Sequence, residues 1–442
     1  MKESLFNVSE KYKDDQYWVY NTLTTSIVIL EEKEYNRYFI DKEYDVRDNT
    51  FKELVSLGLF VGDDDDELEY LKDLRAEVAS SDSPIADLII ATTMECDARC
   101  YYCFEHGCHN EKMSKSTALA VVDYIDKNWN HELFNISWFG GEPLLATDVM
   151  DFISEQLELR KIRFISKITT NGYNLTKENI YKAITVWHTN KIQVSIDAYG
   201  EEYNKIKKYI YDDDNPFGTV IENIGNALSA GLKIRARINF NPIKKETAKK
   251  IMSFLHENYK DEPLFSAYFA PIDAKSSVVP GIAGMFDKEI VHPYIDMIKF
   301  AQKFGYYMGN DRGEKENYLF DKSGLLAQLK LYPSPTNCYA SCPSVFAIDS
   351  KGDIYKCHRV LGKGEKYSSG NIKEGIKKNS IYNFFCNVDV AFDKCNTCKV
   401  LPVCQGGCKI NAYLYDDEHA CIPLKSCVKD VIRIYLDKMI DG

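Results

Sequence analysis

The distribution of cysteines constrains this chain more than any other feature. Fourteen cysteines occur in 442 residues, well below the roughly 8–10 % of a disulfide-stabilised scaffold. None precedes Cys96, four lie between Cys96 and Cys108, and the remaining ten lie between Cys338 and Cys427. In a reducing compartment, clustered cysteines more often bind metal or carry redox chemistry than form disulfides. The distribution therefore predicts two metal-binding regions on either side of a cysteine-free middle.

Length and composition are those of a globular protein with several domains. At roughly 150 residues per domain, the 442 residues predict about three domains, which we place at 1–85, 86–325 and 326–442. A net charge of −11 without a basic cluster argues against nucleic-acid binding. The apolar runs, such as Ile27–Leu30, are far shorter than the ~20 residues of a membrane span. With no apolar signal segment at the amino terminus, the sequence predicts a cytoplasmic protein that binds no membrane.

Residues 1–85 have the pattern of a small winged-helix-like module. Residues that favour strands, separated by a turn, predict two strands, at Tyr17–Tyr20 and Thr25–Glu31. The segments that follow predict two helices and a short strand, at Glu32–Asp41, Thr50–Leu57 and Leu59–Val61. A charged helix, Glu67–Val78, and the turn-rich Ser80–Pro84 are expected to form the linker to the next domain.

From Ala86 onward, strands alternate with amphipathic helices. Six strands are predicted, at Leu88–Thr92, Asn135–Phe139, Phe164–Thr170, Ile192–Asp197, Lys233–Phe240 and Leu264–Ala270. This alternation favours a parallel sheet with right-handed crossovers, so the expected fold class is α/β with a partial (β/α)6 TIM-like barrel. Ligands of such sheets bind at the carboxyl ends of the strands. The first cysteine group follows the first strand, which is such a position.

Cys96, Cys100 and Cys103 offer three thiolates on one short loop. Three cysteines leave one iron of a 4Fe–4S cluster without a protein ligand, and an open metal position is what a catalytic metal site needs. On spacing alone, a zinc knuckle or cysteines that merely pack remain alternatives.

With these residues, CDARCYYC after the first strand, the chain resembles the radical S-adenosylmethionine (SAM) enzymes. The resemblance implies that the open iron binds SAM, whose reductive cleavage gives a 5′-deoxyadenosyl radical. Taken singly, polar residues and glycines at strand ends are more often turns, caps or solvated positions. Together with the cysteine loop, the resemblance implies SAM-contacting roles for Tyr102, Gly140, Gly141, Glu142, Asn171, Ser195, Asp197 and Arg237.

The carboxyl-terminal cysteines resemble the SPASM extension of radical SAM enzymes that modify peptides and proteins. The resemblance implies two auxiliary 4Fe–4S clusters, which with the first make three. The first auxiliary cluster would use Cys338, Cys342, Cys357 and Cys408, and the second Cys395, Cys398, Cys404 and Cys421. Cys421 is preferred to Cys427, because Cys427 lies within the terminal helix and has less freedom to bind. Cys338 is the least secure ligand, since some relatives leave this cluster open to a substrate thiolate.

Within this group, maturases of ribosomally made peptides (RiPPs) often carry an amino-terminal domain that holds the leader of the precursor. The segment that begins Tyr17-Trp18-Val19-Tyr20 resembles the start of such a recognition element, to which an extended leader can add a strand. The resemblance implies a precursor peptide as partner and an electron donor such as flavodoxin or ferredoxin. A thioether cross-link is the commonest product among relatives, and a carbon–carbon link is the next.

Three alternatives remain open at this point. Sulfatase maturases, which make formylglycine, typically place Asp after the cysteine that matches Cys357, where this chain has His358. His358 is a candidate base, although a packing or surface histidine is the more common role. Outside radical chemistry, the chain could be an iron–sulfur electron carrier or a zinc-structural protein, since CxxC pairs also form zinc ribbons.

Overall fold

The computed structural model describes residues 1–79, 87–129, 132–272, 287–304, 338–387, 389, 393–414, 421 and 424–441. Contacts divide the chain into two compact units. The first comprises Met1–Ser81, Ser323–Tyr339 and Asn387–Gly442, and the second comprises Asp82–Lys322 and Ala340–Cys386. The predicted linker Ser80–Pro84 and the predicted domain boundary at 325–326 lie outside the described residues.

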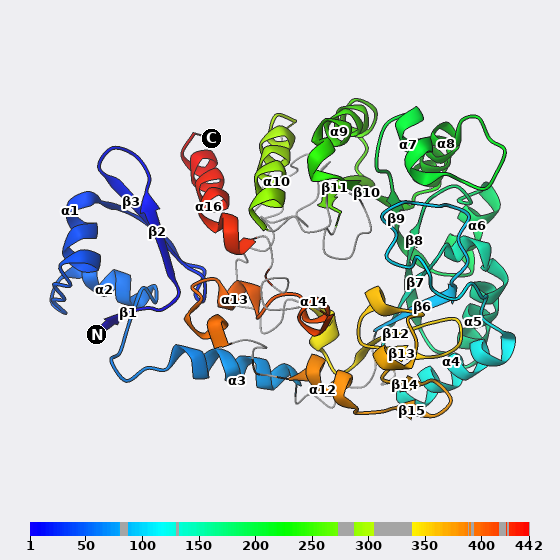
Figure 1. The fold of residues 1–442 in the computed structure, drawn as a ribbon, viewed down its shortest axis with the longest axis horizontal. Helices are drawn as coiled ribbons and strands as arrows, with labels where there is room; N and C mark the ends of the chain where they lie inside the picture. The colour runs from blue at the N-terminus through cyan, green and yellow to red at the C-terminus, as the bar shows by residue number, and fades with distance from the viewer. Residues whose placement is uncertain are drawn as a thin grey trace. The chain divides into compact units, whose positions relative to one another are not determined.

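The first unit begins with an antiparallel sheet and a set of short helices. Strands β2 (Asn7–Lys11), β3 (Gln16–Asn21) and β4 (Ile27–Glu31) pair in that order, and β1 (Lys2–Glu3) pairs with β5 (Phe60–Val61). Figure 1 labels β1, β2 and β3. Helix α1 (Glu32–Tyr35) continues as a π-helix through Asn36–Ile40, and α2 (Asn49–Ser56) and α3 (Glu67–Ala79) follow. The predicted strands and helices are present here, whereas β1 and β2 were not anticipated.

The core of this module is aromatic. Tyr38, Phe39, Phe51 and Phe60 are buried in one cluster with aliphatic neighbours. The rings of Phe51 and Phe60 lie 5.1 Å apart, a distance typical of favourable aromatic pairs. This packing joins the helices to the strands.

The carboxyl-terminal residues complete the first unit. They form the helices α13 (Leu401–Cys404), α14 (Lys409–Leu414) and α16 (Leu424–Asp441). A second buried cluster combines Phe6, Leu23 and Leu71 with Leu401. Near the β2 edge of the sheet, the guanidinium of Arg433 on α16 donates to the Glu10 carboxylate at 2.8 Å. The two ends of the chain therefore share one core.

The second unit is built on an eight-stranded sheet, which confirms the predicted α/β class. Its strand order is β11-β10-β9-β8-β7-β6-β12-β13, and every neighbouring pair is parallel except β12 with β13. The six strands that correspond to the prediction are β6 (Asp87–Thr93), β7 (Phe134–Gly140), β8 (Phe164–Thr170), β9 (Thr189–Ser195), β10 (Lys233–Phe240) and β11 (Phe265–Pro271).

Helices follow each of these strands and cover one face of the sheet (Figure 1). They are α4 (Lys115–Asn128), α5 (Thr147–Leu159), α6 (Lys177–Thr185), α7 (Glu201–Lys207), α8 (Pro216–Ser229), α9 (Lys245–Tyr259) and α10 (Asp287–Gln302). Alternate strand residues such as Ile192, Ile234 and Ile238 are buried beneath them. The residues between face the opposite, concave side of the curved sheet.

The last part of the second unit extends the sheet. Strand β12 (Val345–Ile348) pairs in parallel with β6, and β13 (Ile354–Tyr355) turns back antiparallel on β12. The short pair β14 (Gly370–Asn371) and β15 (Gly375–Ile376) and the helix α12 (Ser380–Cys386) follow. No helix in the described part of the chain has both the length and the apolar character needed to cross a membrane.

Candidate functional site

The first cysteine group occupies the loop between β6 and α4, at the carboxyl end of β6. All three thiols are partly buried. Burial is the main reason that their pKa values are raised, that of Cys103 to about 11, and the Cys100 thiol also raises those of Cys96 and Cys103. The three groups thus lie within electrostatic range of one another. Neutral, buried thiols of this kind become thiolates when a metal supplies positive charge, so this donor set fits a cationic cluster.

Gly140 and Gly141 join the sheet to this loop by close backbone contacts. The amide of Gly141 donates to the Thr93 carbonyl at 3.0 Å. A Cβ on Gly140 would come within 2.1 Å of the same carbonyl, and one on Gly141 within 2.2 Å of the Glu95 carbonyl. Gly140 also has φ of +119°, which L-residues with side chains rarely adopt. Glycine is therefore required at both positions.

Glu142, the third residue of the motif Gly140-Gly141-Glu142-Pro143, is a buried carboxyl group. It accepts from the backbone amides of Leu144 at 3.1 Å and Asn171 at 2.8 Å, and from the Thr170 hydroxyl at 2.7 Å. Burial, followed by the nearby Asp97 carboxylate, raises the pKa of Glu142 to about 7. The carboxylate is thus held at the carboxyl edge of β7 and β8.

Asp97, a residue that the sequence motifs do not single out, lies beside Glu142 and is also buried. The amide groups of Asn171 and Asn174 each donate to one of its oxygens at 2.6 Å. Asn171 therefore contacts both carboxylates. Two buried carboxylates next to the cysteine loop form a site suited to a cationic group, such as the amine of an amino acid.

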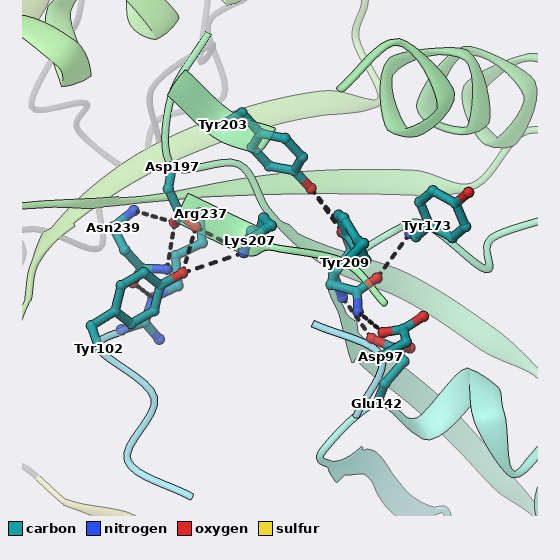
Figure 2. A network of polar contacts seen from close by, with 11 residues as sticks. Asp97, Tyr102, Glu142, Tyr173, Asp197, Tyr203, Lys207, Tyr209, Arg237 and Asn239 are labelled. Carbon is teal, nitrogen blue, oxygen red and sulfur yellow. Dashed lines mark hydrogen bonds and ion pairs between the residues drawn. The ribbon is translucent and has the colours of Figure 1, made fainter. Parts of the chain in front are cut away.

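Asp197 is the centre of a second network, which Figure 2 shows. Its carboxylate accepts from the Tyr102 hydroxyl, from the Asn239 side-chain amide at 2.8 Å and from the Lys207 ammonium at 2.8 Å. Arg237 joins the network through its Nε, which donates to the side-chain oxygen Oδ1 of Asn239 at 2.8 Å. Residues from three separate segments thus converge on one carboxylate.

Lys207, like Asp97, is a functional candidate that the sequence motifs do not indicate. Its ammonium is buried, and it also lies 3.3 Å from the Tyr102 hydroxyl. The Lys207 carbonyl accepts from the Arg99 amide at 2.7 Å, which joins α7 to the cysteine loop. A lysine on a short, charged helix looks like a solvated residue in the sequence. The one signal is its i, i+4 spacing from Tyr203, which is also buried.

Two predicted residues lie near these networks without joining them. Ser195 ends β9 beside Arg237, and no side-chain hydrogen bond links it to the described residues. His358 packs edge-on against the rings of Phe104 and Phe139, at 6.0 and 5.2 Å. Burial, followed by the charge of Arg237, lowers the pKa of His358 to about 4, so the imidazole is neutral at neutral pH.

A cavity of about 240 Å³ lies beside the second network. Its lining includes Tyr101, Asp197, Asn239, Asn241 and Lys244. It opens between the carboxyl ends of β9 and β10, the edge at which open α/β sheets bind their ligands.

The second cysteine region is divided between the two units. Cys395, Cys398, Cys404 and Cys421 all belong to the first unit. The thiols of Cys421 and Cys398 raise the pKa of Cys395, after the larger effect of burial, so these three lie near one another. Cys427 is fully buried in α16, and its pKa is raised to about 12 by burial and the charge of Asp430.

The ligands predicted for the first auxiliary cluster belong to different units. Cys342 and Cys357 lie in the second unit, whereas Cys338 and Cys408 lie in the first. The Lys356 ammonium donates to the Cys342 carbonyl at 2.5 Å, which fixes that turn. Across the described residues, no three Cys, His, Asp or Glu side chains already have the geometry to hold a metal ion. The predicted cluster ligands therefore stay predictions.

Comparison with known proteins identifies the segment that carries the first site. Residues 90–257 match the family model described as the radical SAM superfamily. The GTP 3′,8-cyclase of Staphylococcus carnosus is 24% identical over 295 residues, which cover 62% of this chain and 78% of that protein. The cysteine-type anaerobic sulfatase-maturating enzyme of Clostridium novyi is 23% identical over 358 residues, 73% of this chain and 87% of that protein.

Two solved structures share the fold. Native anSMEcpe with bound AdoMet and Cp18Cys peptide has a TM-score of 0.62 at 16% identity, over 81% of this chain and 98% of that one. Streptococcus suis SuiB bound to the precursor peptide SuiA has a TM-score of 0.56 at 17% identity, over 95% of this chain and 98% of that one. Residues 90–257 of this chain therefore match the radical SAM superfamily, and the chain shares an α/β fold with these two solved structures.

Proposed function

We propose that this chain is a radical SAM enzyme that modifies a ribosomally made precursor peptide, with a thioether cross-link as the product. The observation that carries the proposal is the combination of two features in one chain. One is the cysteine loop joined to the Gly140–Glu142 motif at the carboxyl edge of the sheet. The other is the separate sheet β2–β3–β4 in residues 1–79, which has an edge suited to an extended peptide.

In this proposal Cys96, Cys100 and Cys103 hold a 4Fe–4S cluster, and SAM binds between the two carboxylate networks. Glu142 and Asp97 would bind the amine of SAM, and Asp197, Asn239 and Arg237 would bind its ribose and carboxylate. When bound, the cluster and SAM would supply a carbon-centred radical that could abstract a hydrogen atom from the peptide. The buried carboxylates hold the cationic end of SAM and exclude water from it.

The leader of the precursor docks on the free edge of β4. The opposite edge strand, β2, is contacted by the Arg433 side chain of α16 through Glu10, whereas β4 has no further strand partner among the described residues. Ile29 on β4 is 37% exposed. An exposed apolar side chain on an edge strand favours pairing with another chain. Main-chain hydrogen bonds along such an edge give affinity for an extended peptide of many sequences.

A groove of about 680 Å³ adjoins this edge and suggests the charge of the leader. Its lining holds five carboxylates and two cations, from Asp15, Glu31, Glu32, Lys33, Asn36, Arg37, Asp41 and Glu43. A leader segment with basic residues would complement this groove, and salt would weaken that attraction.

The second candidate function is a sulfatase-type maturase. The similarity to the Clostridium novyi enzyme favours it. Two observations favour the peptide maturase instead. The SuiB fold extends over 95% of this chain, whereas that of anSMEcpe extends over 81%. His358 also stands where sulfatase maturases typically place Asp, and its neutral, aromatic surroundings differ from those of a carboxylate base.

Two auxiliary clusters complete the proposal. Cys395, Cys398, Cys404 and Cys421 would hold one, and Cys338, Cys342, Cys357 and Cys408 the other. Such clusters can accept the electron that is released when the new bond forms, while the thiol proton passes to a base. An external donor such as flavodoxin or ferredoxin would supply the electron that starts each cycle.

The test is made under anaerobic conditions on the full chain. Iron and sulfide per chain are counted after reconstitution, and 5′-deoxyadenosine is measured after addition of SAM and dithionite. The chain is then incubated with small peptides encoded next to its gene, and the products are analysed by mass spectrometry. A variant with Cys96, Cys100 and Cys103 all changed to Ala is the control.

A peptide that loses two hydrogen atoms but keeps its sulfur is expected for a thioether. A peptide whose cysteine loses sulfur would identify a sulfatase-type maturase instead. Iron without SAM cleavage, or zinc in place of iron, would overturn both enzyme functions.

A further inference from the structure

The concave face of the barrel sheet carries an array of cations on three neighbouring strands. Lys167 of β8 lies directly opposite Lys191 of β9, which in turn lies directly opposite Lys233 of β10. Arg235 and Arg237 occupy the next two positions on the same face of β10. The three lysines are exposed, and the residues next to them in sequence, such as Ile192 and Ile234, are buried under the helices on the other face.

Like charges directly opposite one another destabilise a sheet, so this array works against folding. For the three lysines, countercharge is sparse among the residues that the structure describes. No salt bridge joins Lys167, Lys191 or Lys233 to any residue that the structure describes. The other residues of β8–β11 on this face are neutral, among them Thr169, Gln193, Ser195, Asn239, Ser266 and Tyr268. Burial raises the pKa of the Asp87 carboxyl on β6, and the positive charge of Lys167 lowers it by a smaller amount.

The two arginines are held in place on this face. The Arg235 guanidinium lies 4.4 Å from the centre of the Tyr268 ring, and the Tyr268 hydroxyl donates to Gln193 at 2.8 Å. Arg237 donates to Asn239, which also binds Asp197. The array therefore ends at the network that we assign to SAM. Arginines whose planes are fixed in advance lose less entropy when they bind a carboxylate.

We propose that this face binds the carboxylates of the substrate, so that the part of the peptide presented for modification is acidic. The inference rests on the proposed function and specifies its substrate class. Lys233 and Arg235, which precede Arg237 of the SAM network on the same face, are two residues apart, and this spacing on a strand is about 6.6 Å. An extended peptide presents alternate side chains at the same interval. A nucleotide, in contrast, concentrates its charge on one short polyphosphate, which a compact site would bind better than a stripe along three strands.

The test uses fluorescence anisotropy on the full chain after anaerobic reconstitution. The probes are two labelled peptides of alternating Gly and Glu or alternating Gly and Gln, with GTP as an unlabelled competitor. Because the chain has a net charge of −11, its surface as a whole repels the Glu peptide. We expect the Glu peptide to bind about tenfold or more tightly than the Gln peptide. We also expect K191Q/K233Q to remove most of that difference.

The matched control is K127Q/K177Q, which removes two exposed lysines from the outer helices α4 and α6. It should bind the Glu peptide as the unaltered chain does. Equal affinity for the two peptides, or equal losses in both double variants, would overturn the inference. Displacement by GTP at concentrations well below those of the Glu peptide would overturn it in favour of a nucleotide.

Formation of 5′-deoxyadenosine without peptide, measured on the same preparations, separates this inference from the proposed function. Both lysine variants should retain it, because neither contacts the assigned SAM networks. SAM cleavage with no preference for the Glu peptide would contradict the inference alone. A preference for the Glu peptide with no SAM cleavage would contradict the proposed function and leave the anion-binding face established.

Discussion

The Lys207 ammonium lies 2.8 Å from Oδ2 of Asp197, and the two side chains are 2% and 0% exposed. Burial alone would lower the pKa of Lys207, but the Asp197 carboxylate and the Tyr102 hydroxyl raise it well above the usual lysine value. A raised lysine pKa contributes stability below the unfolded value, about 10.4, which is lost only as pH rises through the folded value. The Lys207 ammonium therefore remains charged at physiological pH.

Substitution of Lys207 by Met should destabilise the protein by about 3–5 kcal/mol, because it leaves the buried Asp197 charge unpaired. Urea unfolding of the protein without iron measures the effect. Lys205→Met, on the exposed side of the same helix, is the matched control and should change stability by less than about 0.5 kcal/mol. Equal losses in both variants would show that the ion pair contributes little.

Gly141→Ala should reduce both stability and iron content, since the new Cβ would approach the Glu95 carbonyl to 2.2 Å. The loop that carries Cys96 must then shift. Gly225→Ala is the control, because its Cβ would meet nothing within 4 Å and alanine in α8 should stabilise by about 0.5–1 kcal/mol. Thermal unfolding and iron per chain report the two effects. Normal iron content in Gly141→Ala would contradict the close contact.

Glu142 should make the protein less stable as pH rises from about 5 to 8. Its pKa is raised to about 7 by burial, so the folded state favours the protonated carboxyl and the cost of ionising it grows between the unfolded value, about 4.3, and the folded one. The cost at pH 8 is about 3 kcal/mol. Glu142→Gln should remove this part of the pH dependence, as measured by urea unfolding of the iron-free protein. Parallel stability curves for the two proteins would contradict the assignment.

Cys421→Ser should lower the iron bound per chain, whereas Cys427→Ser should leave it unchanged. The Cys421 thiol raises the pKa of Cys395 and accepts from Lys425 at 3.4 Å, which places it among the other proposed ligands. Cys427 is 1% exposed within α16, so its replacement should affect packing alone, at about 1 kcal/mol. Iron and sulfide analysis after reconstitution decides whether Cys421 or Cys427 is the last ligand. Loss of iron in Cys427→Ser alone would reverse the assignment of the last ligand.

Local periodicity was enough to predict most of the fold. Strand β8 and strand β10 have the predicted bounds. Strand β9, at Thr189–Ser195, begins and ends earlier than the predicted Ile192–Asp197, and its pairing with β8 shifts register near its start. The addition of β12 beside β6 could not be predicted in this way. It pairs Val345 with Asp87, and a short strand carries no local signal for so distant a partner.

The candidate site likewise contains residues that local sequence can predict and residues that it cannot. Residues with a fixed spacing, such as Cys96 and Gly141, could be predicted because the spacing itself limits the chemistry. Asp97 and Lys207 could not, since their roles depend on partners far along the chain, Asn174 for one and Asp197 for the other. Burial of a charged side chain is decided by tertiary packing, and local sequence does not encode it.

The core shared by Phe6, Leu23 and Leu71 with Leu401 imposes an order on assembly. A ribosome that adds roughly 5–20 residues per second needs on the order of tens of seconds between the first of these residues and the last. Until then, the sheet proposed to hold the leader has an uncovered apolar side. The core that contains Phe6 can therefore be completed only when the end of the chain has been made, and the proposed capture of a leader would be deferred until then. A recombinant fragment that stops after α3 would lack Leu401 and would represent the module proposed to bind the leader poorly.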